Sequence, residues 1–261
     1  MNDVPLFSAR GISKNFPLSI TRDGSGVNRA LQYINLDIWE GECLLIAGSN
    51  GSGKTILMKI IAGLMDPSEG DVLFRGQPLA KAVDSLRSSV GLVFQDADAQ
   101  ILGETVAEDT AFGPRNLGLS REQVAERVDA ALKALAIEDK RDFPPRRLSG
   151  GEKRRLAVAG VIAMGCGTVI LDEPFANLDW PGVIHVLEIV RDLKAAGKTL
   201  IILTHELEKV LAFADRLAIL HRGILREDGT PEEVLLRLRP EYGVRNPLHG
   251  YKVVGDCTWL E

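Results

Sequence analysis

Cysteine is scarce in this sequence, and long hydrophobic runs are absent. The three cysteines, Cys43, Cys166 and Cys257, are an odd number and form no CxxC pair or Cys/His metal pattern. We therefore expect reduced thiols in a reducing compartment. The longest mainly apolar stretch covers residues 156–171, contains three glycines and runs directly into two acids. It is too short and badly flanked for a membrane-spanning helix, so any membrane contact should be peripheral.

An excess of positive charge is also lacking. Lysine and arginine number 31 against 36 aspartate and glutamate residues, which gives a net charge of -5. A protein that follows a nucleic-acid backbone needs basic residues gathered on one face, so we expect no nucleic-acid partner. The N-terminal sequence has no basic segment followed by an apolar run, so we expect no secretory signal and a cytosolic protein. The 261 residues suit one α/β domain with an inserted subdomain, or two small domains.

Several short segments have the pattern of β-strands. Apolar and polar residues alternate over 34–38, as in a half-buried strand at an antiparallel edge. Residues 43–47, 169–171 and 199–203 are instead continuous apolar runs, which is typical of strands covered on both faces. Helical stretches separate these runs. The order predicts a parallel sheet whose carboxyl ends collect the chemistry.

Helical patterns fill much of the rest of the chain. Ser120 and Gln123 form a capping-box pattern, and apolar residues then recur at helical spacing. Residues 95–148 are therefore expected to form a mainly helical insertion in the α/β core. Thr230, with a proline and an acid behind it, predicts a last helix that runs to about Leu238. Residues 17–28 have the glycine content of an exposed hairpin loop.

A glycine-rich motif follows the first continuous apolar run. It matches GxxxxGK[ST] and consists of Gly48, Ser49, Asn50, Gly51, Ser52, Gly53, Lys54 and Thr55. Its glycines let backbone N–H groups turn onto phosphate oxygens, Lys54 can pair with the β- and γ-phosphates, and Thr55 can ligate Mg²⁺. The alternative is an ordinary glycine-rich turn before a helix, and chance would give the pattern in roughly one chain of this length per hundred. The sequence therefore predicts a nucleoside triphosphate site.

Two adjacent acids follow the second continuous apolar run. Asp172 stands at the strand end, where a carboxylate can hold Mg²⁺ directly or through water. Glu173 can orient the attacking water and accept its proton, which is general-base catalysis. The alternative is a pair of solvated acids at a strand end. The glycine-rich motif upstream favours the catalytic interpretation.

The segment Leu148-Ser149-Gly150-Gly151-Glu152 could, taken alone, be a serine helix cap followed by a flexible turn. Together with the glycine-rich motif, the two acids and His205, it gives four elements in one order. With this set the chain resembles the ATP-binding cassette (ABC) family over roughly residues 7–238. The resemblance implies an α/β fold, with a P-loop NTPase parallel-sheet core, an antiparallel β edge and an inserted helical subdomain.

The resemblance also implies domain limits and residue roles. An ABC ATPase domain would span residues 1–238, with the helical subdomain at about 95–148, and a short C-terminal extension would cover 239–261. Ser149, Gly150 and Gly151 would be the signature loop, which binds the γ-phosphate of an ATP held by a partner subunit. A serine hydroxyl and free N–H groups at a helix amino end do make an anion site.

Further positions match other motifs of the family. Gln95 corresponds to the glutamine that reaches Mg²⁺ and the attacking water, and His205 to the histidine that contacts the γ-phosphate. Asp179 corresponds to an aspartate that communicates across the dimer. Phe16 stands where the family places an aromatic side chain that stacks on adenine. A phenylalanine at a strand end can equally be a core residue.

A narrower resemblance comes from residues 94–100, 105–114, 116–119 and 151–160, which are similar to the energy-coupling-factor ATPases of vitamin and metal-ion uptake. Ala97, Ala99 and Glu152 depart from that pattern. The resemblance implies a second ATPase subunit, either the same chain or a paralogue, since each ATP site needs a P-loop and a signature loop from different subunits. It also implies a transmembrane transporter component, a substrate-binding membrane subunit and a peripheral location on the cytoplasmic face of the membrane.

The segment after Gln95 is expected to dock a helix of the membrane partner. The candidate residues are Asp98, Gln100, Glu108 and Asp109, for which the alternative is a solvated helix face. Three other functions stay open at this point. They are the ATPase of another ABC transporter class, an ABC ATPase that does not serve transport, and a P-loop kinase.

Overall fold

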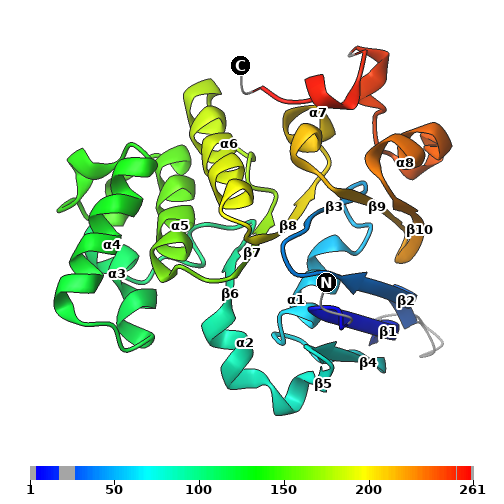
Figure 1. Cartoon of the computed structure of the whole chain (residues 1–261), viewed down its shortest axis with the longest axis horizontal. Coiled ribbons are helices and arrows are strands. Elements are labelled where there is room, and N and C mark those ends of the chain that lie inside the picture. Colours follow the sequence, from blue (N-terminus) through cyan, green and yellow to red (C-terminus); the bar gives the residue numbers. More distant parts are fainter. Residues whose placement is uncertain (1–3, 18–26, 251, 260–261) are drawn as a thin grey trace.

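Two β-sheets with helices packed around them form the fold in the computed structural model, which describes residues 4–17, 27–250 and 252–259 (Figure 1). Most of the predicted hairpin loop at 17–28 lies outside the described residues. Both sheet types expected from the sequence are present, so the predicted fold class is confirmed. All three cysteines are buried.

The larger sheet contains six strands among the described residues and is mainly parallel. Its order is β10 (Ile224–Gly229), β9 (Arg216–His221), β3 (Cys43–Ala47), β8 (Thr199–Thr204), β7 (Thr168–Asp172) and β6 (Val90–Val93). Strand β3 runs parallel to β8 and β9, and β7 runs parallel to β6 and β8. All five residues of β3 and all five of β7 are buried, as expected for strands covered on both faces.

The smaller sheet is antiparallel. Its order is β2 (Val27–Ile38), β1 (Phe7–Pro17), β4 (Glu69–Phe74) and β5 (Gln77–Pro78). The alternating residues of the predicted half-buried strand lie in β2, at the edge of this sheet. Ile34, Leu36 and Ile38 are buried there, while Asn35 is exposed. The period-two pattern therefore predicted both the strand and its buried face.

Helices cover the larger sheet and form the insertion (Figure 1). The α-helices are α1 (Lys54–Ile61), α2 (Val83–Ser89), α3 (Val106–Asn116), α4 (Arg121–Ala134), α5 (Gly150–Met164), α6 (Trp180–Ala195), α7 (Leu207–Val210) and α8 (Pro231–Arg237). Short 3-10 helices cover Leu79–Lys81, Glu138–Lys140, Pro145–Arg147, Leu211–Phe213, Pro240–Tyr242, Pro247–His249 and Val254–Asp256. Both predicted capping boxes form, at the starts of α4 and α8. Within the described residues, no helix has both the length and the apolar character needed to cross a membrane.

The larger sheet separates two hydrophobic cores. Cys43 and Leu45 of β3 face a core shared with α3, α4, α5 and α6, whereas Leu44 and Ile46 face a core shared with α1 and the antiparallel sheet. This division follows from the alternation of side chains along a strand. Helices α3 and α4 pack against α5, so the insertion is joined to the sheet through that helix.

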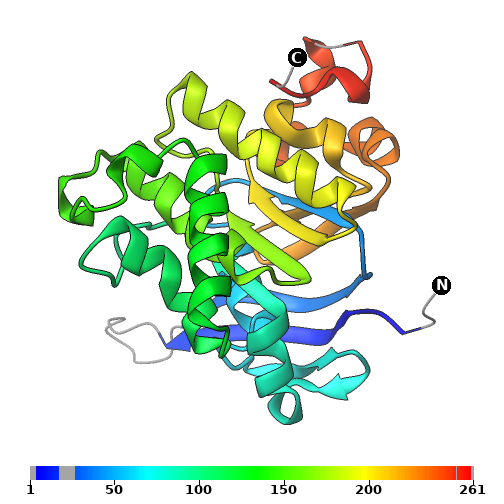
Figure 2. The ribbon, with the colours of Figure 1, turned by 60° about the vertical axis from the view of Figure 1, so that its left-hand side comes forward.

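The C-terminal segment lies beside α7 (Figures 1 and 2). The N–H group of Ala212 donates a hydrogen bond of 3.1 Å to the carbonyl of Cys257. The ring of Trp259 stacks on that of Trp180, with centroids 5.1 Å apart, and Lys209 Nζ lies 4.5 Å from the Trp259 ring centroid. The segment therefore packs onto the start of α6, close to Asp179.

Candidate nucleotide-binding site

The glycine-rich motif forms a tight loop between β3 and α1. Gly53 is the N-cap of α1 in the left-handed region, with a φ of +106°. A Cβ on Gly48 would lie 2.1 Å from the carbonyl oxygen of Leu220, so only glycine fits there. The first turn of α1 contains no acidic residue, so its N–H groups and helix dipole offer uncompensated positive potential to an anion.

A cavity of about 370 Å³ lies over this loop. It is lined by Asn50, Gly51, Ser52, Gly53, Lys54, Thr55, Ile56, Gln95 and Glu173. Two residues predicted from other motifs, Gln95 and Glu173, thus reach the same space as the loop. Parallel pairing explains this, because β3, β6 and β7 all end at one edge of the sheet.

Lys54 is buried beneath the loop. Its Nζ donates hydrogen bonds to the carbonyl of Gly48 at 2.7 Å and to that of Ser49 at 3.4 Å. The same Nζ lies 3.5 Å from Glu173 Oε1. The amine is therefore a fixed positive charge inside the loop, where it can attract phosphate oxygens.

Asp172 lies behind the loop, fully buried at the end of β7. Thr55 Oγ1 donates a 2.8 Å hydrogen bond to Asp172 Oδ2, while Asp172 Oδ1 is buried without a hydrogen-bond partner among the described residues. Burial raises the pKa of Asp172 above its ordinary value, and the bond from Thr55 opposes this. A hydroxyl and a carboxylate with an unused buried oxygen are the hard oxygen donors that suit Mg²⁺.

Glu173 is buried between Lys54 and His205. His205 Nδ1 and Glu173 Oε2 form a 3.0 Å hydrogen bond, and the Glu173 N–H donates to the carbonyl of Leu203 at 2.8 Å. The φ of Glu173 is +48°, a left-handed conformation that costs a non-glycine residue roughly 1–2 kcal/mol. Such local strain is found where a side chain must point in one direction. Here it points the carboxylate into the cavity.

Ser149 is the N-cap of α5, as the alternative interpretation of that segment proposed. The Glu152 N–H donates to Ser149 Oγ at 3.3 Å, and the Ser149 N–H donates to Glu152 Oε2 at 2.7 Å. Hydrogen bonds from Lys140 and from the backbone of Ser149 lower the pKa of Glu152 to about 2. Ser149 and Gly150 are exposed, and no described residue of the signature loop lines the P-loop cavity. This helix end is therefore exposed and lies outside the P-loop cavity of its own chain.

Asp179 and Phe16 lie outside the P-loop cavity. Asp179 Oδ1 caps α6 by accepting a 3.0 Å hydrogen bond from the N–H of Gly182. Phe16 is half-buried near the end of β1 and pairs with Asn28 of β2. Strand β2 passes close to the loop, because a Cβ on Gly53 would lie 2.8 Å from the carbonyl of Ala30.

Two side chains in the segment after Gln95 form hydrogen bonds with nearby backbone groups. Gln100 Nε2 donates to the carbonyl of Leu92, and its Oε1 accepts from the N–H of Phe94, both at 3.0 Å. Asp109 Oδ1 accepts from the N–H groups of Leu102 and Gly103 at 2.7 and 2.9 Å. Both side chains therefore hold the local backbone, and the docking role expected of Gln100 and Asp109 stays a prediction.

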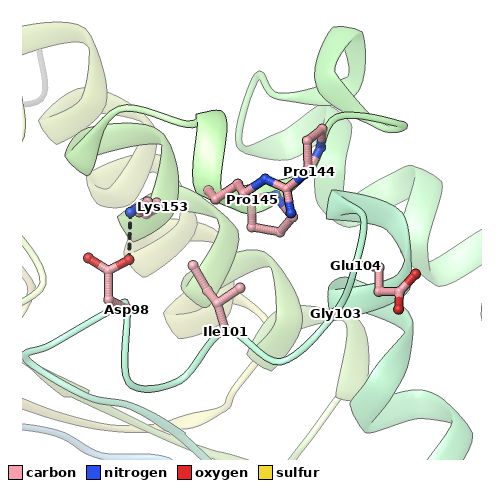
Figure 3. Close-up of a pocket in the computed structure, with 8 residues that line it drawn as sticks. Asp98, Ile101, Gly103, Glu104, Pro144, Pro145 and Lys153 are labelled. Carbon is pink, nitrogen blue, oxygen red and sulfur yellow. Dashed lines mark hydrogen bonds and ion pairs between the residues drawn. The ribbon is translucent and has the colours of Figure 1, made fainter.

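Two cavities flank this segment. The first, about 620 Å³, contains an ion pair of 2.6 Å between Asp98 and Lys153 (Figure 3). The second is a groove of about 340 Å³ between β6, α3 and α5. Leu102 and Phe112 line the groove, and 68% and 51% of their surfaces are exposed.

No role was predicted for Arg154 from the sequence motifs. It is buried on α5 and donates hydrogen bonds to the backbone carbonyls of Gln95 and Glu173. A signal was present in the sequence, because Ala157, Val158 and Val161 follow Arg154 at the spacing of one buried helix face. A charged residue on such a face indicates a specific partner.

Comparison with known proteins gives consistent results. A family model described as ABC transporter matches residues 31–176. The energy-coupling factor transporter ATP-binding protein EcfA of Methanocaldococcus jannaschii is 42% identical over 215 residues, which cover 81% of this chain and 76% of that protein. The structure of cbiO1 from Clostridium perfringens, part of the ABC transporter complex cbiONQ, has a TM-score of 0.74 at 35% identity. The match covers 97% of this chain and 98% of the cbiO1 chain. The structure of a dimeric ATP-binding cassette in a post-hydrolysis state, bound to ADP and Pi, has a TM-score of 0.78 at 26% identity. The match covers 86% of this chain and 98% of that one.

Replacing Lys54 by alanine should weaken MgATP binding by about 10- to 100-fold or more, because the change removes the buried cation of the loop. Isothermal titration calorimetry measures the affinity. Lys59→Ala, a matched change on the same helix, should leave affinity within about twofold, since Lys59 is not among the residues that line the cavity. Unchanged affinity in folded Lys54→Ala would remove Lys54 from the site.

Proposed function

The chain belongs to the ABC transporter family as an ATP-binding and ATP-hydrolysing subunit, and we propose that it energises an importer of the energy-coupling-factor class, which takes up vitamins or transition-metal ions. One observation carries the catalytic part of this proposal. The buried Glu173 carboxylate lies between Lys54 and His205, at 3.5 and 3.0 Å, in the cavity over the phosphate-binding loop. A base placed there can act on water beside a γ-phosphate.

ATP would be held by the loop and its lysine. Backbone N–H groups of residues 49–55 and the amine of Lys54 would surround the β- and γ-phosphates. Thr55 and Asp172, with Gln95 at the rim, would hold Mg²⁺, which supplies positive charge to the phosphates when bound. The ring of Phe16, on the strand beside β2, would stack on adenine.

Hydrolysis would depend on three side chains. Glu173 would accept the proton of the attacking water, and Gln95 would orient that water through its amide. The Nδ1 of His205 already bonds the Glu173 carboxylate, so its other ring nitrogen, Nε2, is left to contact the γ-phosphate. Water is the acceptor in this scheme, which separates it from a kinase reaction.

Each complete site would need two subunits. Ser149 and Gly150 are exposed at the amino end of α5 and do not line the P-loop cavity of their own chain, so Ser149, Gly150 and Gly151 would bind the γ-phosphate held by a partner. Asp179 would communicate across this interface. The partner would be a second copy of this chain or a paralogous ATPase. The dimeric structural relative supports such an arrangement.

The groove between β6, α3 and α5 would bind a helix of the transmembrane component. Its exposed apolar side chains, Leu102 and Phe112, are suited to the apolar face of such a helix. Gln95 lines the P-loop cavity, and the segment that follows it lines the groove. Nucleotide binding could therefore move the docked helix. The subunit would be peripheral on the cytoplasmic face, and a separate membrane subunit would bind the transported solute.

Glu173→Gln should slow phosphate release by about 10²-fold or more while ATP stays bound, because the amide can hydrogen-bond water but cannot take its proton. ATP should also trap the dimer. Phosphate release without any added acceptor and sedimentation with MgATP measure both effects. Glu208→Gln, on α7 outside the cavity, is the control and should behave like the parent. Parental turnover in Glu173→Gln, with monomer only, would contradict the base assignment.

Leu102→Asp should reduce assembly with the membrane components about tenfold or more, because it places a charge in the apolar groove. ATPase activity of the isolated subunit should stay within about twofold, since Leu102 is mostly exposed and lies outside the P-loop cavity. Leu236→Asp makes the same change at an exposed leucine of α8, where 87% of the surface is accessible, and should assemble normally. Recovery with the transporter and transport rate are the measurements. Equal assembly of the two variants would exclude the groove as the docking site.

A further inference from the structure

Arg154 is a buried charged residue with an unusual set of partners. It lies on α5, five residues after Ser149, and only 3% of its surface is exposed. Removing a guanidinium from water is costly unless its N–H groups find acceptors. The burial also lowers the pKa of Arg154 below its ordinary value, although nearby Asp172 and Glu173 oppose this effect. The partners of the side chain must therefore repay a large desolvation cost.

The four acceptors that Arg154 has among the described residues are backbone carbonyl oxygens. Nη1 lies 2.6 Å from the carbonyl of Phe94 and 2.6 Å from that of Gln95. Nη2 lies 2.9 Å from the carbonyl of Asp172 and also donates to that of Glu173. One planar group thus joins the chain after β6 to the end of β7. A lysine could not do this in the same way, because its amine is a single point charge without a fixed fork.

The two peptide segments joined by Arg154 carry the catalytic side chains. Gln95 and Glu173 line the same cavity, and the guanidinium fixes the backbone of both residues from behind. The bond to the Glu173 carbonyl also supports a residue that is held at a φ of +48°. Without this support, Glu173 could relax towards an ordinary conformation and turn its carboxylate away from the water.

We propose that Arg154 is a positioning residue for ATP hydrolysis, which sets Gln95 and Glu173 relative to each other through their backbone carbonyls. The inference rests on the proposed roles of those two residues. Arg154 itself would not touch nucleotide, because it is buried and is not among the residues that line the cavity. Its loss should therefore affect the chemical step and leave nucleotide binding nearly unchanged.

The first test compares Arg154→Met and Arg154→Lys with the parent chain. We expect kcat to fall by about 10²-fold in Arg154→Met, as for other displacements of catalytic groups by about 1 Å, with the KM for ATP within about threefold. Arg154→Lys should recover part of the loss, since it keeps one charge near the carbonyls. If Arg154→Met does not fold, as judged by thermal unfolding, Arg154→Lys carries the same comparison.

Arg155→Met is the matched control. Arg155 is the next residue on α5, is half-buried, and also donates to backbone carbonyls, those of Leu135 and Ala136 at 3.3 and 3.5 Å. These carbonyls belong to the insertion and not to the cavity. Its loss should leave kcat within about threefold. An equal fall of kcat in Arg155→Met would mean that any loosening of α5 has this effect, and it would overturn the proposal.

A double-mutant cycle separates positioning from general damage. If Arg154 acts through Glu173, adding Arg154→Met to Glu173→Gln should lower the remaining turnover by less than about threefold, since the base is already absent. Additive losses would overturn the proposal. A parental rate in Glu173→Gln alone would instead refute the catalytic assignment of Glu173. A parent that hydrolyses ATP but fails to energise transport would refute the proposed function and leave this inference standing.

Discussion

The parallel register of three strands is the constraint on which the site depends. Ala47 of β3 pairs with Thr204 of β8, and Asp172 of β7 pairs with Leu203 of β8, so the three strands end side by side. The loop after β3, Glu173 after β7 and His205 after β8 therefore start from one edge of the sheet. Backbone hydrogen bonds and two hydrophobic cores fix this register. The same register brings together the charged groups of the site, which are far apart in the sequence.

Burial of charge is the second common feature of the site. Lys54, Asp172, Glu173 and Arg154 are all nearly inaccessible, and each is close to a group of opposite polarity. In a medium of low effective dielectric these contacts are stronger than in water, and the loss of one partner is correspondingly expensive. The same environment would strengthen the attraction between the loop and a triphosphate. The positive groups of the loop are thus already in place to attract an anion.

The segment between β6 and α3 connects the site to the outer surface. Gln95 is at one end of the segment, in the P-loop cavity, while Leu102 is in the groove beside α3. Gln100 and Asp109 hold the backbone in between, and the Asp98 ion pair ties it to α5. A segment held at several points moves as a unit, so a shift of Gln95 in one cavity would also shift Leu102 in the other. α5 also begins at the signature loop, so both ends of the proposed coupling meet on one helix.

The sequence by itself determined the strands, the capped helices and the residues of the P-loop, because period-two alternation, capping boxes and GxxxxGK[ST] are local patterns with local causes. The glycine-rich motif and the two acids also predicted that Lys54 and Glu173 belong to one function, whereas Gln95 was added to them only through resemblance to a family. Local patterns gave no sign that Gln100 and Asp109 bond to backbone groups, because those groups lie six to eight residues away along the chain. They also gave no role to Arg154, since its four partners come from segments 59–60 and 18–19 residues away. Only the tertiary structure decided these contacts, because a hydrogen bond between distant segments depends on how the sheet and α5 pack.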